Sequence, residues 1–302
     1  MIHNNILSLI GHTPLVKINK IVGPDDAEVF VKLEKLNIGG SVKDRLALYL
    51  IESAEEKDKD LKNKTLIEAS SGSTGISLAM IAAVKGYDLT IVMPESVSIE
   101  RRKLIKAYGA KLVLSEGSQG TGGAIELKKK IVAENPQQFV PMDQHSNPAN
   151  IRSHFETTAE EIWEDIGDRV DMIVVAVGTG GTGIGVSKKL KAHNPGIKIV
   201  GVTPEIGVSI QGLRHPMEKN GSKIFDRNSF DELIEISKEE VPTTYEFSRR
   251  LAREEGLLSG MSAGAAMYIA AAKARELGKG KTIVTLLADS GDRYLSTDLF
   301  EE

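Results

Sequence analysis

The sequence predicts an α/β protein in which parallel strands are covered by helices on both faces. Short runs of β-branched and aliphatic residues alternate with longer amphipathic segments along most of the 302 residues. The strand-like runs are apolar almost throughout, which is typical of strands that are buried on both faces of a parallel sheet. A chain of this length is expected to form one large domain or two medium-sized domains.

The predicted strands and helices follow one another along the chain. Valine, isoleucine and threonine favour the strands, which are predicted at 27–34, 65–69, 89–94, 110–115, 172–178, 197–204 and 281–288. Helices are predicted at 41–56, 75–85, 98–108, 122–134 and 182–192. The stretch DQHSNPAN at 143–150 is rich in turn-forming residues and is the best candidate for a domain boundary.

Composition excludes several classes of protein. The net charge of −4 gives no reason to expect binding to nucleic acid or to an anionic membrane surface. No apolar run approaches the roughly 20 residues that a membrane-spanning helix needs, and the first residues lack the features of an export signal. There is no cysteine, so disulfides, thiolate metal sites and a cysteine nucleophile are excluded. We therefore expect a cytoplasmic protein.

A hydroxyl-rich loop, SSGSTG at 70–75, directly follows a predicted strand and precedes a helix. Capping that helix is the ordinary structural role of such residues. The loop has more hydroxyls than one cap uses, on Ser70, Ser71, Ser73 and Thr74. Together with the free N–H groups of the helix start, these hydroxyls would form a cradle for a carboxylate.

A glycine-rich loop, GTGGTG at 178–183, occupies the equivalent place after another strand. Glycines let the backbone approach an anion closely, so that successive N–H groups can surround a phosphate. The loop also matches G-x-G-x-x-G, and Glu205 follows at the end of the next strand, as in dinucleotide-binding proteins. A nicotinamide-dependent oxidoreductase is therefore an alternative prediction.

Two further features point to one cofactor. The stretch GGSVKDR at 39–45 places Lys43 at the start of a helix, and Ser290 follows the last predicted strand. Pyridoxal phosphate uses a lysine amine, a phosphate site and a partner for its pyridine nitrogen, and its amino-acid substrate brings a carboxylate. A nicotinamide cofactor would leave Lys43 and the 70–75 loop without a role.

The order of these motifs resembles the cysteine synthase family, the O-acetylserine sulfhydrylases and their cystathionine β-synthase relatives. The matching stretches are KLEKLNIGGSVKDR, SSGSTGISLAMIAA, MPESVSIERRKLIKAYGAKLVL, GTGGTGIGV, GLLSGMSAGAA and DSGDRYLST, within about residues 10–297. The resemblance implies the tryptophan-synthase-β type of pyridoxal phosphate fold (fold type II), with two open parallel-sheet domains. Residues 40–148 would form a smaller domain that closes over the substrate. Residues 1–39 and 149–302 would form the larger domain that binds the cofactor phosphate.

The resemblance also implies a role for individual residues. Lys43 corresponds to the lysine that forms the Schiff base with pyridoxal phosphate and then moves the α-proton. The residues implied for the substrate carboxylate are Ser70, Ser71, Ser73, Thr74 and Gln144, of which Ser73 also lies beside the cofactor. Those implied for the cofactor phosphate are Gly178, Thr179, Gly180, Gly181 and Thr182, and Ser290 would face the pyridine nitrogen.

The reaction implied is synthesis of L-cysteine from an O-activated L-serine and sulfide. The resemblance further implies a homodimer, with serine acetyltransferase as a candidate partner. Where the family has threonine and asparagine, this chain has Ser70 and Ser73. The segment 205–221 resembles the B-type enzymes, some of which use O-phosphoserine, and Arg214 lies where such an enzyme places an arginine toward the donor phosphate.

Three alternatives remain open at this point. A cysteine β-lyase or a cystathionine β-synthase would use the same cofactor with a different second substrate. The oxidoreductase depends only on the glycine loop and Glu205. A protein that binds the cofactor without catalysis and serves as a partner protein is the third.

Overall fold

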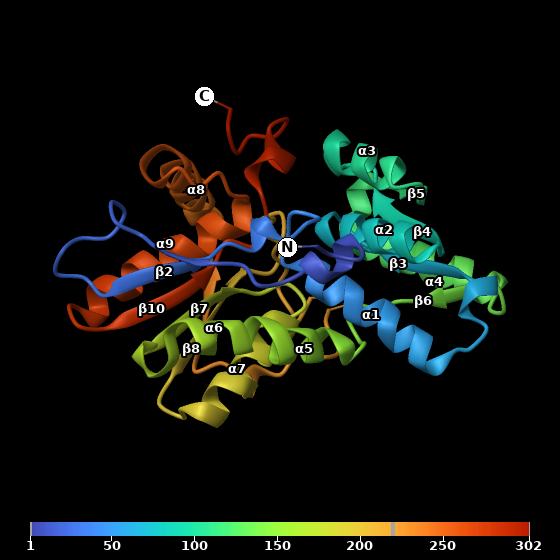
Figure 1. Ribbon diagram of the computed structural model, residues 1–302. Coiled ribbons are helices and arrows are strands. Elements are labelled where there is room, and N and C mark those ends of the chain that lie inside the picture. Colours follow the sequence, from blue (N-terminus) through green and yellow to red (C-terminus); the bar gives the residue numbers. More distant parts are fainter. Residues whose placement is uncertain (1, 219–220, 302) are drawn as a thin grey trace.

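The larger of two sheets forms one side of the molecule. The computed structural model describes residues 2–218 and 221–301, so residues 219 and 220 of the B-type-like segment lie outside the described residues. The strand order is β1-β2-β10-β7-β8-β9, and Figure 1 labels β2, β10, β7 and β8 of this sheet. The bounds are β1 Leu15–Lys17, β2 Glu28–Lys32, β7 Met172–Ala176, β8 Lys198–Pro204, β9 Glu232–Ile236 and β10 Thr282–Leu286. Neighbouring strands are parallel, apart from the antiparallel edge pair β1–β2.

The smaller sheet lies beside it and is parallel between all neighbouring strands. Its order is β5-β4-β3-β6, and it occupies the right-hand half of Figure 1. The bounds are β3 Thr65–Ala69, β4 Asp88–Pro94, β5 Lys111–Ser115 and β6 Phe139–Pro141. Parallel strands end at the same edge of a sheet, so the loops after β3 and β7 are placed at the edges where ligands bind in such folds.

Helices cover both faces of each sheet. The smaller sheet has α1 Lys43–Lys57, α2 Ser73–Lys85 and α3 Ile99–Ala107 on one face and α4 Gly120–Glu134 on the other. The larger sheet has α6 Ala159–Ile166 and α7 Gly181–His193 on one face and α8 Val241–Glu255 and α9 Met261–Leu277 on the other. A short helix, α5 Ala149–Ser153, continues through a π-helical turn, η5 His154–Thr158, into α6.

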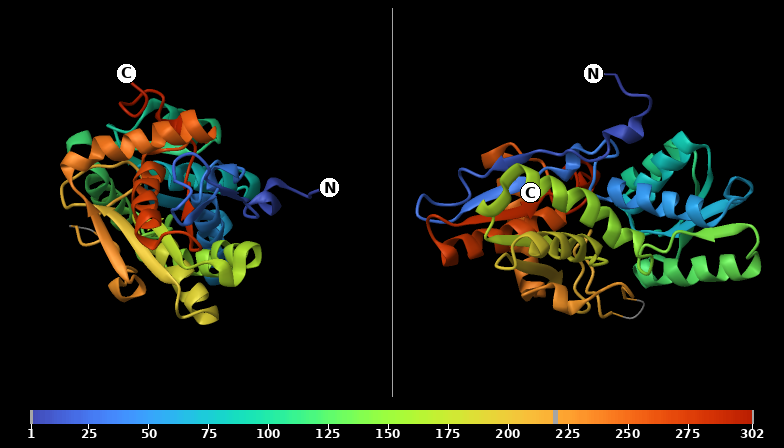
Figure 2. Two further views of the ribbon diagram at one scale, coloured as in Figure 1. Left: turned by 90° about the vertical axis from the view of Figure 1, so that its left-hand side faces the viewer. Right: turned by 60° about the horizontal axis from the view of Figure 1, so that its bottom comes forward.

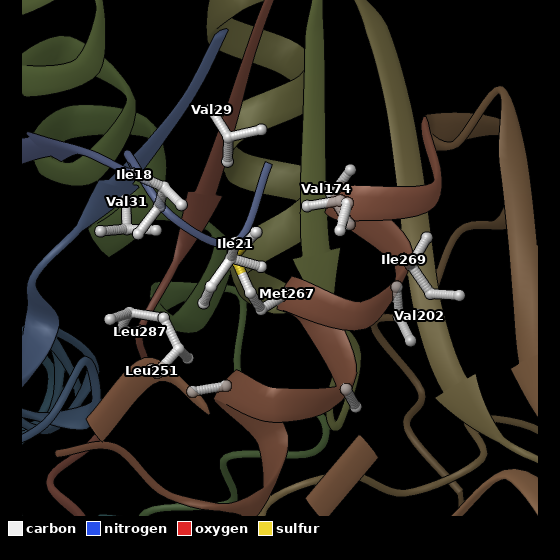
Figure 3. Packing of buried hydrophobic residues seen from close by; sticks show 14 of the residues in the cluster. Ile18, Ile21, Val29, Val31, Val174, Val202, Leu251, Met267, Ile269 and Leu287 are labelled. Atoms are coloured by element: carbon white, nitrogen blue, oxygen red, sulfur yellow. The ribbon is translucent and has the colours of Figure 1, made fainter. Parts of the chain in front are cut away.

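Buried apolar side chains fill the space between the larger sheet and helices α8 and α9. Val29 and Val31 of β2 and Val174 of β7 pack with Met267 of α9 in one fully buried cluster (Figure 3). Burial of one such side chain contributes roughly 1.5–3 kcal/mol relative to exposure. The strands that lead to the site therefore rest on a well-buried apolar core.

The prediction of an α/β fold with parallel sheets is confirmed, with differences at the edges. The short strands β1, β6 and β9 and helices α5, α6, α8 and α9 were not predicted. The last strand ends at Leu286, two residues earlier than predicted. The strands of each sheet fall on their own side of the proposed boundaries at 39/40 and 148/149, which remain a prediction. Among the described residues, none of the helices combines the length and the apolar character needed to cross a membrane.

Candidate functional site

The turn before Lys43 is built from two glycines because charged side chains press against it. A Cβ on Gly39 would lie 2.6 Å from Oδ1 of Asp44, and one on Gly40 would lie 2.8 Å from Nη2 of Arg293. Gly40 also has φ of +80°, a conformation that other residues rarely adopt. Helix α1 then begins at Lys43, which is half-buried because its side chain lines a cavity.

Buried charges anchor the start of α1. Arg45 donates to Glu34 at 2.8 Å and to Glu161 at 2.5 Å, so α1 is tied both to the segment after β2 and to α6. Asp44 accepts hydrogen bonds from the main chain of Gly39 and from Ser77, and burial raises its pKa to about 6. Removing one member of such a buried network leaves a charge without its partner, which makes this region costly to distort.

The amine of Lys43 is suited to exchange a proton. Burial lowers the pKa of its ammonium below the ordinary value of 10.5, and the carboxylates of Asp289 and Glu34 act in the opposite direction. A larger fraction of the amine is therefore neutral near pH 7 than for an exposed lysine. A neutral amine can act as a base or as a nucleophile.

The glycine loop faces Lys43 across a narrow inner recess of the cavity. Gly178, Thr179, Gly180 and Thr182 line this recess together with Lys43, whereas Gly181 does not. Gly180 has φ of +88°, and a Cβ there would lie 2.9 Å from the ring of Phe225. The loop ends at the N-terminus of α7, where the N–H groups of the first helical turn and the helix dipole favour an anion.

The hydroxyl-rich loop forms another wall of the cavity. Ser70, Ser71, Ser73, Thr74 and Gln144 all line it, as the sequence predicts for neighbours of one ligand. Thr74 donates to Oε1 of Gln144 at 2.8 Å, and the amide of Gln144 donates to the carbonyl of Ala69 at 3.1 Å. Ser70 accepts from the N–H groups of Gly72 and Gly75 at 3.1 Å each. These hydrogen bonds fix the turn of the loop and tie it to Gln144.

Ser73 belongs to a hydrogen-bonded chain that the sequence did not reveal. Arg293 donates to Oγ of Ser73 at 2.8 Å, and Ser73 donates to Oδ2 of Asp289 at 3.2 Å. Tyr294 donates to the same carboxylate oxygen at 2.8 Å. Asp289 and Tyr294 line the cavity. These three residues lie 216–221 positions after Ser73, so only the folded chain brings them together.

The role predicted for Ser290 toward the pyridine nitrogen stays a prediction, and its position in the fold does not favour it. Ser290 pairs with Ser259 in an isolated bridge and is not among the residues that line the cavity. Ser262, in the first turn of α9, lines both the main cavity and the inner recess beside Lys43. The stretch GLLSGMSAGAA contained the signal, since its small residues precede a helix that starts at the cavity.

The whole cavity has a volume of about 1040 Å³. Arg101 of α3 reaches across one side of it and donates to Gln211 at 2.7 Å and to the carbonyl of Ser71 at 3.2 Å. Arg214 lines the outer part, where its Nε donates to Glu218 at 3.2 Å. Burial lowers the pKa of His145, which lines the same part, to about 4, so its imidazole is neutral at pH 7.

The residues present fit pyridoxal phosphate. The inner recess combines a buried lysine amine, a glycine loop at a helix N-terminus and the hydroxyl of Ser262. Gly212 leaves room beside Ser262, since a Cβ at position 212 would lie 3.1 Å from Oγ of Ser262. Lys43 would hold the aldehyde end of the cofactor, the glycine loop its phosphate, and Ser262 would be the partner for its pyridine nitrogen.

Comparisons with known proteins indicate the same cofactor. The family model described as pyridoxal-phosphate dependent enzyme matches residues 6–289. The chain is 45% identical to the cysteine synthase of Staphylococcus aureus, over 98% of this chain and 97% of the relative.

Two solved structures are also similar to this one. One is an O-ureido-L-serine synthase, with a TM-score of 0.92 and 39% identity over 99% of this chain and 96% of the other. The second is a hydrogen sulfide-producing enzyme from Fusobacterium nucleatum, with a TM-score of 0.90 and 39% identity over 97% and 100%. The chain therefore belongs to the family of pyridoxal-phosphate dependent enzymes and, within it, to the cysteine synthases.

Proposed function

We propose that the protein uses pyridoxal phosphate to make L-cysteine from an O-activated L-serine and sulfide. The observation that carries this proposal is the shared cavity, in which Lys43 faces both the glycine loop and the hydroxyl-rich loop. An amino-acid substrate needs its carboxylate held on one side of the reacting carbon and a base on the other. Similarity to cysteine synthases supports the same conclusion.

Each part of the cavity has a task in this reaction. Pyridoxal phosphate, when bound, withdraws electrons from the α-carbon of the substrate. The loop of Ser70, Ser71, Ser73 and Thr74, together with Gln144, holds the substrate carboxylate, which fixes the α-carbon near Lys43. The amine of Lys43 takes the α-proton as the β-substituent leaves and returns it after sulfide has added. Ser262 offers a neutral hydroxyl instead of a carboxylate, which suits β-replacement better than transamination.

O-Acetylserine is the donor that the site favours. Arg214 could bind a donor phosphate, because guanidinium groups bind phosphate oxygens well and stay charged. Here Glu218 already accepts a hydrogen bond from Arg214 and lines the same cavity. A phosphate at this place would therefore meet a carboxylate as well as the guanidinium, whereas a neutral acetyl group would not be repelled.

The nicotinamide alternative has no support at the site. Glu205 is exposed after the end of β8 and is not among the residues that line the cavity. The β-lyase alternative shares the whole site, and one structural relative is named as a hydrogen sulfide-producing enzyme. The β-lyase alternative is therefore the better supported of the two, and it needs a direct test.

A product assay separates cysteine synthesis from β-elimination. Purified holoenzyme is incubated with O-acetylserine, O-phosphoserine, serine or cysteine, each with and without sulfide. We expect cysteine to form fastest from O-acetylserine with sulfide. Faster release of sulfide from cysteine than its incorporation would assign the protein as a β-lyase, and inertness toward all four would assign it as a cofactor-binding partner protein.

We also propose a cytoplasmic homodimer, with serine acetyltransferase as a candidate partner. The N-terminal segment extends away from the rest of the molecule (Figure 2) and carries the exposed apolar side chains Ile2, Ile6 and Leu9. Apolar residues on a projecting arm are well suited to cover a second subunit. Sedimentation analysis should give about twice the mass of the chain, and a monomer would exclude this assembly.

A further inference from the structure

The segment formed by α5 and the π-helical turn η5 presses directly on the start of α7. A Cβ on Gly181 would lie 1.9 Å from Oδ1 of Asn150, and a Cβ on Gly185 would lie 2.8 Å from Cβ of His154. Contacts under 3 Å cannot form without movement of one partner. These two glycines therefore serve the close packing of this segment, and Gly181 does so without lining the cavity.

Close packing lets two buried polar side chains reach the threonines of the glycine loop. The amide nitrogen of Asn150 donates to Oγ1 of Thr179 at 2.9 Å and to the carbonyl of Gln144 at 2.8 Å. Since a carbonyl only accepts, the nitrogen of this amide is the atom that faces both partners. Nε2 of His154 lies 3.1 Å from Oγ1 of Thr182.

The other ring nitrogen of His154 is also engaged. Nδ1 lies 2.9 Å from Oγ1 of Thr158, at the far end of the same π-helical turn. His154 and Thr158 are fully buried, so neither exchanges its partner with water. Single π-helical turns are uncommon and occur often at functional sites.

We propose that Asn150 and His154 are positioning residues that aim the hydroxyl hydrogens of Thr179 and Thr182 at the cofactor phosphate. This inference rests on the cofactor of the proposed function and not on the identity of the donor. A threonine has one O–H to donate. Thr179 already accepts from Asn150, so its hydrogen is available to the phosphate.

The hydrogen bonds of His154 also assign the proton on its ring. Thr182 keeps its hydrogen for the phosphate only if Nε2 of His154 carries the ring proton and donates it to Thr182. Nδ1 must then accept the hydroxyl hydrogen of Thr158. The opposite tautomer would take the hydrogen of Thr182 away from the phosphate. Burial lowers the pKa of His154 well below its usual value, with the charges of Lys43 and Arg45 acting in the same direction, so the ring is neutral and carries one proton.

Cofactor affinity tests the positioning role without using turnover. Pyridoxal phosphate is removed from the purified protein, and its dissociation constant is measured on adding it back. We expect His154→Leu to bind about tenfold more weakly, as for the loss of one good hydrogen bond. His154→Gln, which keeps a donor in the place of Nε2, should recover most of the affinity.

Thr157→Val is the matched control on the same turn. Its hydroxyl donates to the carbonyl of Ser153 at 2.5 Å and does not face the glycine loop. Its affinity for the cofactor should stay within about twofold of the wild type, whereas Thr158→Val should bind several-fold more weakly. If His154→Leu does not fold, as judged by its thermal unfolding, Thr158→Val carries the test, since it keeps the imidazole.

The tautomer gives an independent readout. ¹⁵N NMR of histidine-labelled holoenzyme, with the His154 signals assigned by their loss in His154→Gln, should show the proton on Nε2. A proton on Nδ1, or unchanged cofactor affinity in His154→Leu and Thr158→Val, would overturn the proposal. Failure of the wild type to bind pyridoxal phosphate would instead refute the cofactor assignment, so the two failures are distinguishable.

Discussion

The two loops that face Lys43 are held by different kinds of interaction. The glycine loop at 178–182 is bound by short, neutral and buried side chains, those of Asn150 and His154. The hydroxyl-rich loop at 70–74 has a neutral contact with Gln144 as well, but it is also bound by long charged side chains from other segments, Arg101 from α3 and Arg293 from the segment after β10.

This difference matches the tasks proposed for the two loops. A cofactor phosphate stays bound through many turnovers, so rigid short contacts within the larger-sheet side of the molecule suit it. A substrate carboxylate must enter and leave in every cycle. Contacts through long side chains between separate segments can be broken and remade with small backbone movement. We therefore expect changes at the two loops to separate cofactor affinity from substrate affinity.

Lys43→Ala should have the largest effect, because Lys43 is the group that both loops serve. We expect turnover to fall by about 10³-fold or more, the scale of a lost acid–base catalyst. Borohydride reduction of the wild type, followed by peptide mapping, should place the pyridoxyl group on Lys43. Lys17→Ala, at an exposed ion pair with Glu28, should retain full activity. A reduced adduct on another lysine would contradict this role.

Arg293→Gln should remove a charged hydrogen bond that fixes the hydroxyl-rich loop. Arg293 donates to Ser73 and to the carbonyl of Gly39, so its loss loosens two walls of the cavity at once. We expect KM for the donor to rise about 30-fold, from the roughly 1.5–3 kcal/mol of hydrogen bonds to a charged group, with cofactor affinity unchanged.

The control for Arg293 is Arg249→Gln. Arg249 also donates to a main-chain carbonyl, that of Leu299 at 2.8 Å, and does not line the cavity. Its KM should match the wild type. If Arg293→Gln weakened cofactor binding as much as donor binding, the two loops would not be independent and the comparison would fail.

Ser262→Ala and Ser290→Ala test which of the two serines is the partner of the pyridine nitrogen. Ser262 lines the inner recess, whereas Ser290 lies outside it. We expect Ser262→Ala to change the visible absorption of the bound cofactor and to lower turnover by about tenfold, the scale of one lost hydrogen bond. Ser290→Ala should leave the spectrum unaltered. The reverse result would support the prediction for Ser290.

Arg214→Ala should reveal whether the outer part of the cavity recognises a donor phosphate. Any effect should be confined to O-phosphoserine and reach about tenfold in kcat/KM, because Glu218 offsets part of the roughly 1.5–3 kcal/mol that a charged hydrogen bond supplies. Turnover of O-acetylserine should change little. Equal losses with both donors would reject donor recognition by Arg214.

Ser73→Asn should have the smallest effect of these changes. The longer amide would have to share the space between Arg293 and Asp289, which a serine hydroxyl spans with bonds of 2.8 and 3.2 Å. We expect the cofactor to remain bound and donor preference to shift by about fivefold or less, the scale of a rearranged water-mediated contact. Unchanged kinetics with every donor would show that Ser73 acts only at the start of α2.

Much of the site was predictable because it depends on local order along the chain. A strand followed by a polar or glycine-rich loop and then a helix places that loop at the ligand-binding edge of a parallel sheet. This rule identified both loops, and Lys43 followed from its position at a helix start. The resemblance to cysteine synthases then added Gln144, which lines the cavity.

The sequence by itself determined the α/β class, the two ligand-binding loops and the lysine between them, because each depends on residues within one strand–loop–helix unit. Only the tertiary structure decided that Ser262 and not Ser290 lines the recess, and that Ser73 meets Asp289 and Arg293. It also decided that His154 reaches Thr182. These contacts join segments between 28 and 220 residues apart, and they exist only where packed helices and strand ends set the distance between side chains.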